Sequence, residues 1–322
     1  MRRSTVIIAI ILIFLFASLS GCSTKNGDQT PQAPPEGLNV SNDDKTVYPF
    51  TLVDDTGTEI TIPAKPQRIV SLLPSSTEIL AALGQTPVAV TQWDDYPANI
   101  QEKAEYIFED ALNPNLEQLL NLQPDLIMFW LTSQEDTDKI RNLGIPVVVF
   151  DDKNISEVYD TIALTGKITD TPEQASQIIE QMKAKEKGIE SKIDKLSQEE
   201  RRKVWIEVDS NLYTAGSGTF LDEIITKAGG VNIARDVNGW GKFNSEQVIA
   251  RNPDVIFETY SYFDKNAIEN ILKRKGWENI EAIKNKRVIG LDNNIISRQG
   301  PRIVDGLEIA AHAIYPELFD GK

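Results

Sequence analysis

One internal repeat limits what this chain can fold into. Residues 115–120 and 124–127 read NLEQLL and PDLI, and residues 244–249 and 253–256 read NSEQVI and PDVI. Each copy predicts a helix, a Pro-Asp turn and a strand. Two copies are too few for a solenoid, so we expect two similar lobes that face one another across a cleft.

The sequence around both copies alternates short apolar runs with helical patterns, which is typical of parallel α/β folds. We therefore predict an N-terminal α/β lobe at 47–170 and a C-terminal α/β lobe at 201–322. Thr171 and Pro172 suit the cap and first position of a helix that runs to about Leu196, so residues 171–200 are predicted to join the lobes. Such a helix is roughly 35 Å long.

Two local motifs precede the first repeat. Alternation in 48–53 and 59–62 around an Asp-Thr-Gly turn predicts a hairpin. After a buried strand at 68–73, Ser75 and Glu78 fit a capping box, with Ser75 as the N-cap. Glu78 is therefore interpreted as a capping residue and not as a functional acid.

The first residues have the order of a secretory signal. Arg2 and Arg3 precede an apolar run at 6–17, which is short for a membrane-spanning helix of roughly 20 residues, although a retained anchor helix is the alternative. Residues 19–22 read LSGC and resemble the bacterial lipobox, so residues 1–21 are expected to be removed and Cys22 to carry a lipid. Cys22 is the only cysteine. Residues 22–46 are polar and rich in Pro and Gly, which predicts a flexible tether.

The formal net charge of -15 makes nucleic acid an improbable partner. The acidity serves either solubility or docking to a basic surface.

Candidate ligand residues follow from the rule that ligands bind at the carboxyl ends of parallel strands. Those predicted to contact a ligand are Ser75, Trp93, Tyr96, Trp130, Tyr213, Trp240, Tyr260 and Arg298. Aromatic rings on loops suit a broad, partly apolar ligand, although each ring has the alternative of packing against its own lobe. Arg298 and Arg302 are placed to meet carboxylate or phosphate groups, but Arg302 equally suits the start of the last helix and a pair with Asp305.

Catalysis finds little support in the residue types. His312 is the only histidine, so neither a Ser-His-Asp triad nor a His-rich metal site is expected. We predict no catalytic residues, no metal site and no cofactor, and any metal is expected to arrive inside an organic chelator. Gly216 and Gly218 are interpreted as a tight turn and not as a phosphate loop.

Glu117 and Glu246 occupy matching places in the repeat, each at about the second position after a predicted asparagine cap, Asn115 or Asn244, at the amino end of its helix. One explanation is favourable pairing with the helix dipole, worth about 0.3–1 kcal/mol. The other is that they form a symmetric pair of negative points for a partner with two basic pockets.

Several motifs together resemble the substrate-binding proteins of bacterial ABC importers for iron chelates and cobalamin, in which one rigid helix joins two lobes. These motifs are residues 68–72 (RIVSL), 76–78 (STE), 95–97 (DYP), 113–117 (NPNLE), 213–216 (YTAG), 229–232 (GGVN) and 300–302 (GPR). The resemblance implies that Glu117 and Glu246 dock into arginine pockets of a permease dimer. It also implies that Trp93, Trp240 and Arg298 lie in the cleft. The aromatic that the cobalamin branch tends to place near Asp110 and Ala111 is missing.

We therefore expect a lipid-anchored protein on the outer face of the cell membrane that is not an enzyme. It would deliver a corrinoid or a ferric siderophore to an ABC permease. A haem-binding protein of the same class and a surface enzyme acting on carbohydrate are the alternatives. The similar contexts of Glu117 and Glu246 disfavour the enzyme, because a catalytic acid and base need environments that separate their pKa values.

Overall fold

The computed structural model describes residues 45–130 and 133–320. The expected signal peptide, Cys22 and the tether up to residue 44 lie outside this range. Within it, no helix has the length and apolar character needed to cross a membrane.

The N-terminal lobe is built on a five-stranded parallel sheet with the order β5-β4-β3-β6-β7. Its strands are β3 (Ile69–Ser71), β4 (Ala89–Thr91), β5 (Tyr106–Phe108), β6 (Leu126–Trp130) and β7 (Val147–Phe150). Its helices are α1 (Pro74–Ala82), α2 (Ile100–Lys103), α3 (Leu116–Asn121), α4 (Gln134–Arg141) and α5 (Ile155–Ile168). Most strand residues are apolar because successive side chains enter separate cores on the two faces. Met128 belongs to one core and Phe129 to the other.

A hairpin of β1 (Phe50–Val53) and β2 (Glu59–Ile62) precedes this sheet, which confirms that prediction. Leu52 and Ile62 pack into the same core as Met128. Asp54 fixes the hairpin to the lobe, because its carboxylate accepts hydrogen bonds from Arg141 and from the Val149 amide.

The C-terminal lobe contains a four-stranded parallel sheet with the order β10-β8-β12-β13 and a separate antiparallel pair, β9 and β11. The strands are β8 (Lys203–Glu207), β9 (Tyr213–Ala215), β10 (Val231–Asn232), β11 (Trp240–Lys242), β12 (Val255–Glu258) and β13 (Val288–Gly290). The helices are η1 (Gln198–Glu200), α7 (Phe220–Lys227), α8 (Ser245–Arg251), α9 (Ala267–Leu272), α10 (Glu281–Lys284), α11 (Asn293–Ile296), α12 (Ile303–Ile314) and α13 (Pro316–Phe319). The expected α/β class with two parallel sheets is confirmed.

The two copies of the repeat have the same structure. Asn115 and Asn244 each cap their helix by accepting a hydrogen bond from the amide three residues later. In the turns that follow, Asp125 accepts from the Arg68 amide at 3.0 Å and Asp254 from the Lys203 amide at 2.7 Å. Each aspartate therefore ties its own strand, β6 or β12, to the start of the neighbouring strand, β3 or β8.

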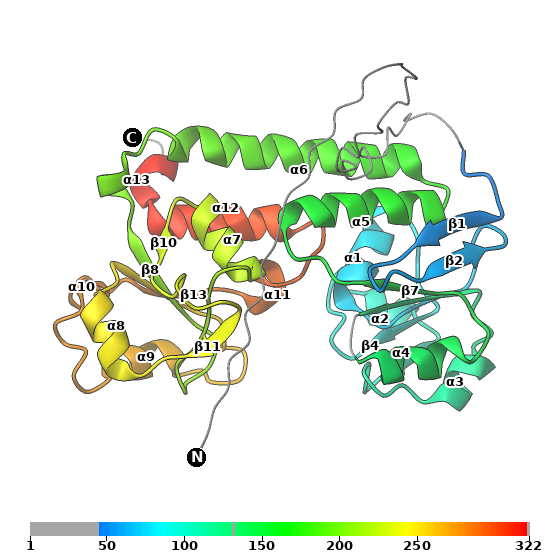
Figure 1. Ribbon diagram of the computed structural model, residues 1–322, viewed down its shortest axis with the longest axis horizontal. Helices are drawn as coiled ribbons and strands as arrows, with labels where there is room; N and C mark the ends of the chain where they lie inside the picture. Colours follow the sequence, from blue (N-terminus) through cyan, green and yellow to red (C-terminus); the bar gives the residue numbers. More distant parts are fainter. Residues whose placement is uncertain (1–44, 131–132, 321–322) are drawn as a thin grey trace, which may run out of the picture. The chain divides into compact units, whose positions relative to one another are not determined.

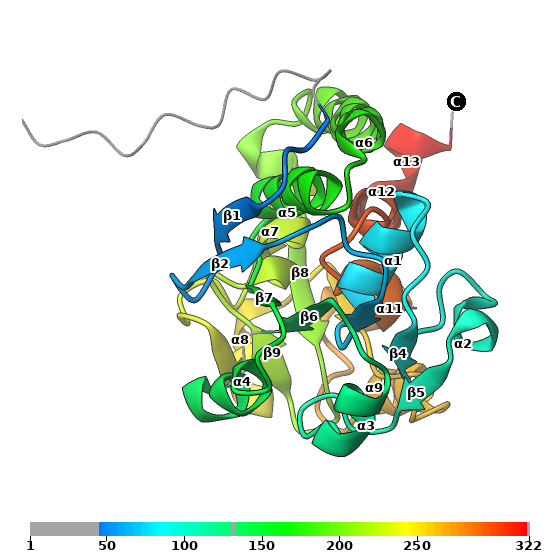
Figure 2. The same cartoon turned by 90° about the vertical axis from the view of Figure 1, so that its right-hand side faces the viewer.

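A long helix, α6 (Pro172–Ile193), follows the N-terminal lobe in the chain. It begins at the expected proline and ends three residues before the expected Leu196. Figure 1 shows it along α5 and α12, and both helices contact it. In Figure 2, α5 and α6 lie one above the other, with the β1–β2 hairpin beside α5. A single apolar core contains residues of α1, α5, α6, α7 and α12, so it is continuous between the lobes.

The capping box expected at Ser75 and Glu78 is wrong. Helix α1 begins at Pro74, so Leu73 occupies the cap position and no side chain caps the helix. A proline fits the first position because its fixed φ is already helical. Ser75 lies in the first turn, and the Glu78 carboxylate is directed to the C-terminal lobe, where it binds two arginines.

Candidate functional site

The carboxyl ends of the parallel strands in both lobes surround three adjacent pockets of about 450, 260 and 480 Å³. The first is lined by Pro74, Gln92, Trp93, Asp95, Tyr262, Asp292, Asn293, Asn294 and Arg298. The second is lined by Leu73, Ser75, Trp130, Phe150, Asp151, Asp152, Ser297 and Gln299. The third is lined by Thr259, Ser261, Tyr262, Lys265, Ile268, Gly290, Leu291, Asp292, Asn293 and Asn294. The first and third pockets share Tyr262 and residues 292–294, and Ser75 of the second pocket adjoins Pro74 of the first. The three pockets therefore form one cleft with lining residues from both lobes.

Three aromatic rings line this cleft and remain exposed. Trp93 follows β4, Trp130 ends β6 and Tyr262 follows β12, and they are 61%, 48% and 64% exposed. At such exposure these three rings are not core residues. They offer flat apolar surface from both lobes to a ligand.

Two other predicted ligand residues have different surroundings. Ser75 lines the second pocket but is nearly buried. The Tyr96 ring stacks on the Arg302 guanidinium, with 4.1 Å between the guanidinium carbon and the ring centroid, and it lines none of the three pockets.

For Tyr260 the structure requires a correction. Its ring is only 1% exposed and packs in a core of the C-terminal lobe. Its hydroxyl donates to Glu207 at 2.7 Å, and burial raises the tyrosine pKa far above its usual range. The Tyr260 side chain therefore packs within the C-terminal lobe, and the neighbouring Tyr262 is the residue that lines the cleft.

Tyr213 and Trp240 lie apart from the cleft lining. Tyr213 begins β9 and Trp240 begins β11, and these short strands pair antiparallel. Both rings are exposed, but neither lines the three pockets.

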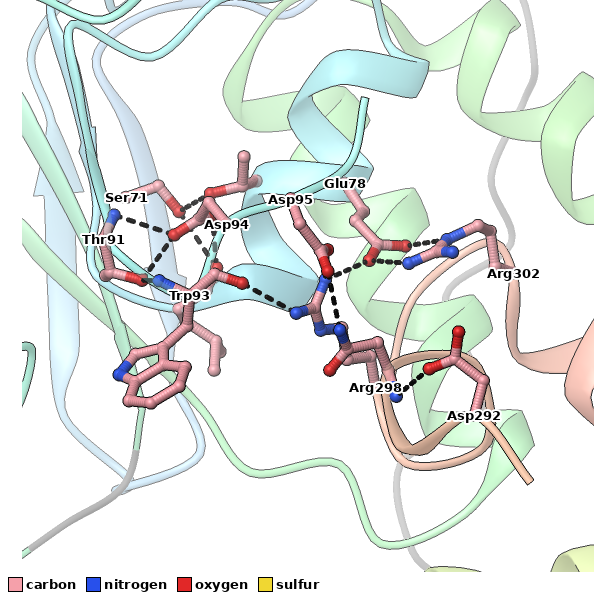
Figure 3. Close-up of polar contacts among 12 residues, drawn as sticks. Ser71, Glu78, Thr91, Trp93, Asp94, Asp95, Asp292, Arg298 and Arg302 are labelled. Atoms are coloured by element: carbon pink, nitrogen blue, oxygen red, sulfur yellow. Dashed lines mark hydrogen bonds and ion pairs between the residues drawn. The ribbon is translucent and has the colours of Figure 1, made fainter. Parts of the chain in front are cut away.

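A network of ion pairs crosses from the N-terminal lobe to the C-terminal lobe at the cleft (Figure 3). Glu78 on α1 is only 1% exposed and receives two hydrogen bonds from Arg302, at 2.8 Å and 2.6 Å. This hydrogen bonding raises the Arg302 pKa. Arg298 donates to Glu78 at 3.1 Å, to Asp95 at 2.5 Å and to the Trp93 carbonyl at 2.7 Å. Asn294 donates to the other oxygen of Asp95 at 2.6 Å.

This network changes the interpretation of both arginines. Arg298 lines the cleft, but its terminal nitrogens already bind protein oxygens, so they are not free for a ligand carboxylate. Arg302 directly precedes α12, but its carboxylate partner is Glu78. Asp305 pairs with Lys185 on α6 instead, at 2.7 Å.

Two carboxyl groups at or near the cleft have raised pKa values. Asp94 follows Trp93 and accepts hydrogen bonds from the amide and hydroxyl of Thr91, while burial raises its pKa. Burial also raises the pKa of Asp152 in the second pocket to about 7, although a hydrogen bond from Thr161 opposes the shift. Among residues 45–130 and 133–320, no three His, Cys, Asp or Glu side chains are grouped to hold a metal ion.

Glu117 and Glu246 lie away from the cleft, each at the second position of its helix. Both side chains are exposed, and neither pairs with a cation among the described residues. Each is followed three positions later by an exposed apolar residue, Leu120 or Ile249.

Comparisons with known proteins agree with this geometry. YvrC of Bacillus subtilis, named an uncharacterized ABC transporter substrate-binding lipoprotein, is 36% identical over 282 residues, which cover 85% of this chain and 88% of YvrC. The vitamin B12-binding protein of Salmonella typhimurium is 27% identical over 241 residues, 74% of this chain and 86% of that protein.

A solved structure from Staphylococcus epidermidis, described as a possible iron-binding (periplasmic solute-binding) protein, has a TM-score of 0.68 and 35% identity, and the match covers 78% of this chain and all of that one. The model of the family described as "Periplasmic binding protein" matches residues 69–295. The chain therefore belongs to the periplasmic binding protein family, whose members bind their ligands and are not enzymes.

Proposed function

We propose that this protein captures a corrinoid or a ferric siderophore outside the cytoplasm and delivers it to the permease of an ABC importer. The observation that carries the proposal is the cleft at the strand ends of both lobes, into which Trp93, Trp130 and Tyr262 project. Flat, partly apolar walls suit a large ring or chelate. The names of YvrC and of the vitamin B12-binding protein support the importer and the ligand class.

The metal would enter the cleft already wrapped in its organic ligand. The described lining of the three pockets contains no histidine or cysteine, so a bare transition metal would find few of its preferred ligands there. Haem, bound by the same kind of protein, is the second candidate.

Tryptophan fluorescence tests the proposal directly. We expect cobalamin, cobinamide or a ferric siderophore to quench the fluorescence of the soluble protein with saturation, because Trp93 and Trp130 lie at the cleft. Trp93→Phe and Trp130→Phe should each remove part of the quench. Trp240→Phe is the comparison, because Trp240 lies outside the three pockets. Lack of saturable quenching by every chelate and by haem would contradict the proposed function.

We propose that Glu117 and Glu246 dock the protein onto a permease with two basic pockets. Their matching positions, exposure and lack of a cation partner support this role, and Leu120 and Ile249 would add an apolar contact beside each carboxylate. Glu117→Ala and Glu246→Ala should leave ligand affinity unchanged and lower uptake, with the double variant lowest. Loss of one partner of a buried interfacial charge pair costs about 2–5 kcal/mol.

The control is Glu59→Ala, which removes an exposed carboxylate from β2. Ligand affinity and cellular uptake are measured for all four variants. Full uptake in the double variant, or weaker ligand binding in either single variant, would show that the two glutamates are not docking residues.

We propose that a lipid on Cys22 holds the protein at the outer face of the cell membrane. The LSGC motif and the lipoprotein name of YvrC support this anchor. Metabolic labelling with a fatty acid should mark the protein, and Cys22→Ser should abolish both the label and the membrane attachment. Label that persists on Cys22→Ser would contradict the lipobox assignment.

A further inference from the structure

The positive charge that Arg298 contributes to the cleft is balanced by the protein itself. Its guanidinium contacts the carboxylates of Glu78 and Asp95, and only 13% of its side chain is exposed. Rotation of Arg298 toward an anionic ligand would leave Asp95 without its cation and Glu78 with Arg302 alone. Arg298 is therefore poorly suited to compensate the charge of an anion.

Three further carboxylates belong to the lining. Asp292 faces both the first and the third pocket, and Asp151 and Asp152 face the second. Glu258, next to Thr259 of the third pocket, is fully buried and accepts hydrogen bonds from Ser261 and from the Tyr260 amide. It forms no salt bridge among the described residues.

Lysines offset these acids only in part. Lys153 pairs with Asp151 at 2.5 Å, which balances that carboxylate alone. Lys265, in the third pocket, is the single lysine among the described lining residues of the three pockets. The acids in the described lining, Asp95, Asp151, Asp152 and Asp292, therefore outnumber its cations, Arg298 and Lys265. Asp152, with its pKa of about 7, is only partly ionised at neutral pH, so the excess of negative charge near the exposed aromatic rings comes mainly from the other three. Aromatic faces also attract cations and not anions.

From this balance we propose that the cleft selects neutral or cationic metal complexes and rejects polyanionic ones. This inference rests on the proposed function and narrows its ligand class. An amidated corrinoid or a ferric trihydroxamate carries no net negative charge and meets the lining without repulsion. A ferric tricatecholate, with three negative charges, and haem, with two carboxylates, would bring anions against carboxylates that no free arginine balances.

Matched probes separate charge from shape. Dicyanocobinamide and dicyanocobyrinic acid share one corrin ring, but the first carries neutral amide side chains and the second carries carboxylates. A ferric trihydroxamate and a ferric tricatecholate form a second pair, and haem is added as a fifth probe. In fluorescence titrations we expect one pair to bind, and within that pair the neutral member should have an affinity about 100-fold higher than the anionic member. Equal or tighter binding of the anionic member would overturn the inference while leaving the proposed function intact.

Failure of all five probes would instead overturn the proposed function, and the inference with it. The two results are therefore distinct. Raising the ionic strength should also narrow the preference within a pair, since salt screens exposed charges.

Two variants test the cause of the preference. Asp95→Asn removes one of the two carboxylates that balance Arg298, and Asp292→Asn removes a cleft charge while keeping an oxygen that can cap α11. Each should shift the ratio of anionic to neutral affinity toward the anion by roughly tenfold. Glu59→Gln makes the same change of charge on β2 and should leave the ratio unaltered. An unaltered ratio in both cleft variants, with the fold preserved by circular dichroism, would overturn the electrostatic explanation.

Discussion

Glu78 joins the two lobes through a buried salt bridge. Its carboxylate is almost fully buried, and it is shared by Arg302 and Arg298, which come from the other lobe. A buried pair of this kind adds little net stability compared with apolar packing, but removing one partner is costly because the other charge stays buried without compensation. The contact therefore acts mainly by fixing the position of α1 against the segment before α12.

Glu78→Gln should lower the free energy of unfolding by about 3 kcal/mol, because two partly buried guanidinium groups lose their shared counter-charge. Urea denaturation measures this loss. The matched control is Glu105→Gln, since Glu105 also makes a two-pronged pair with an arginine, Arg68, but both side chains are exposed. Solvent screens that pair, so Glu105→Gln should leave the unfolding midpoint nearly unchanged. Similar losses in the two variants would contradict the assignment of a structural role to burial at Glu78.

The same residue shows where sequence reasoning ends. Asn115 and Asn244 could be identified as caps because a cap and its amide lie three positions apart, and the structure confirms both. Glu78 also matched a local motif, but its partner Arg302 lies 224 positions away, and the pairing exists only after both lobes fold. The prediction that Tyr260 contacts a ligand has a related weakness, because a position at a strand end does not reveal whether the ring turns inward to Glu207 or outward to the cleft.

At the scale of elements, α5 and α6 pack closely against one another. A Cβ atom at Gly166 would lie 2.5 Å from the Cβ of Ala175 and 3.2 Å from the carbonyl oxygen of Thr171, so the two helix backbones approach one another there. Tyr159 adds a polar contact by donating to Glu186 at 2.6 Å. The sequence predicted α6 because its proline and its uninterrupted helical pattern are local, but the small residue that allows the close approach lies on a different helix.

Gly166→Ala should destabilise the protein by about 1–3 kcal/mol, because the added methyl group overpacks the α5–α6 contact. Gly188→Ala makes the same substitution in an exposed part of α6, where a Cβ meets nothing within 4 Å. It should stabilise the helix by about 0.5–1 kcal/mol, because alanine has the higher helix propensity. Thermal or urea unfolding of both variants gives the comparison. Stabilisation by Gly166→Ala would show that the helices separate more easily than the structure indicates.

At the scale of the whole described molecule, the continuous apolar core limits how far the two lobes can move relative to one another. Met182 and Ile189 of α6 share one apolar cluster with Ile162 of α5 and Leu307 of α12. Wide closure would have to expose part of this cluster, which costs about 25 cal/mol for each Å² of apolar surface brought into water. The glutamate-arginine network joins the lobes at a second place, near the cleft. Small rotations and side-chain movements at the cleft are therefore expected on binding.

Ligand binding should accordingly change the radius of gyration by less than about 1 Å. Small-angle X-ray scattering of the soluble Cys22→Ser protein, with and without a ligand identified by fluorescence, measures this change. A cleft variant that no longer binds the ligand serves as the control for effects of the ligand on scattering alone. Compaction of several ångströms in the binding-competent protein, absent from the control, would show that α6 or one of its junctions is a hinge and that the shared core opens in the ligand-free state.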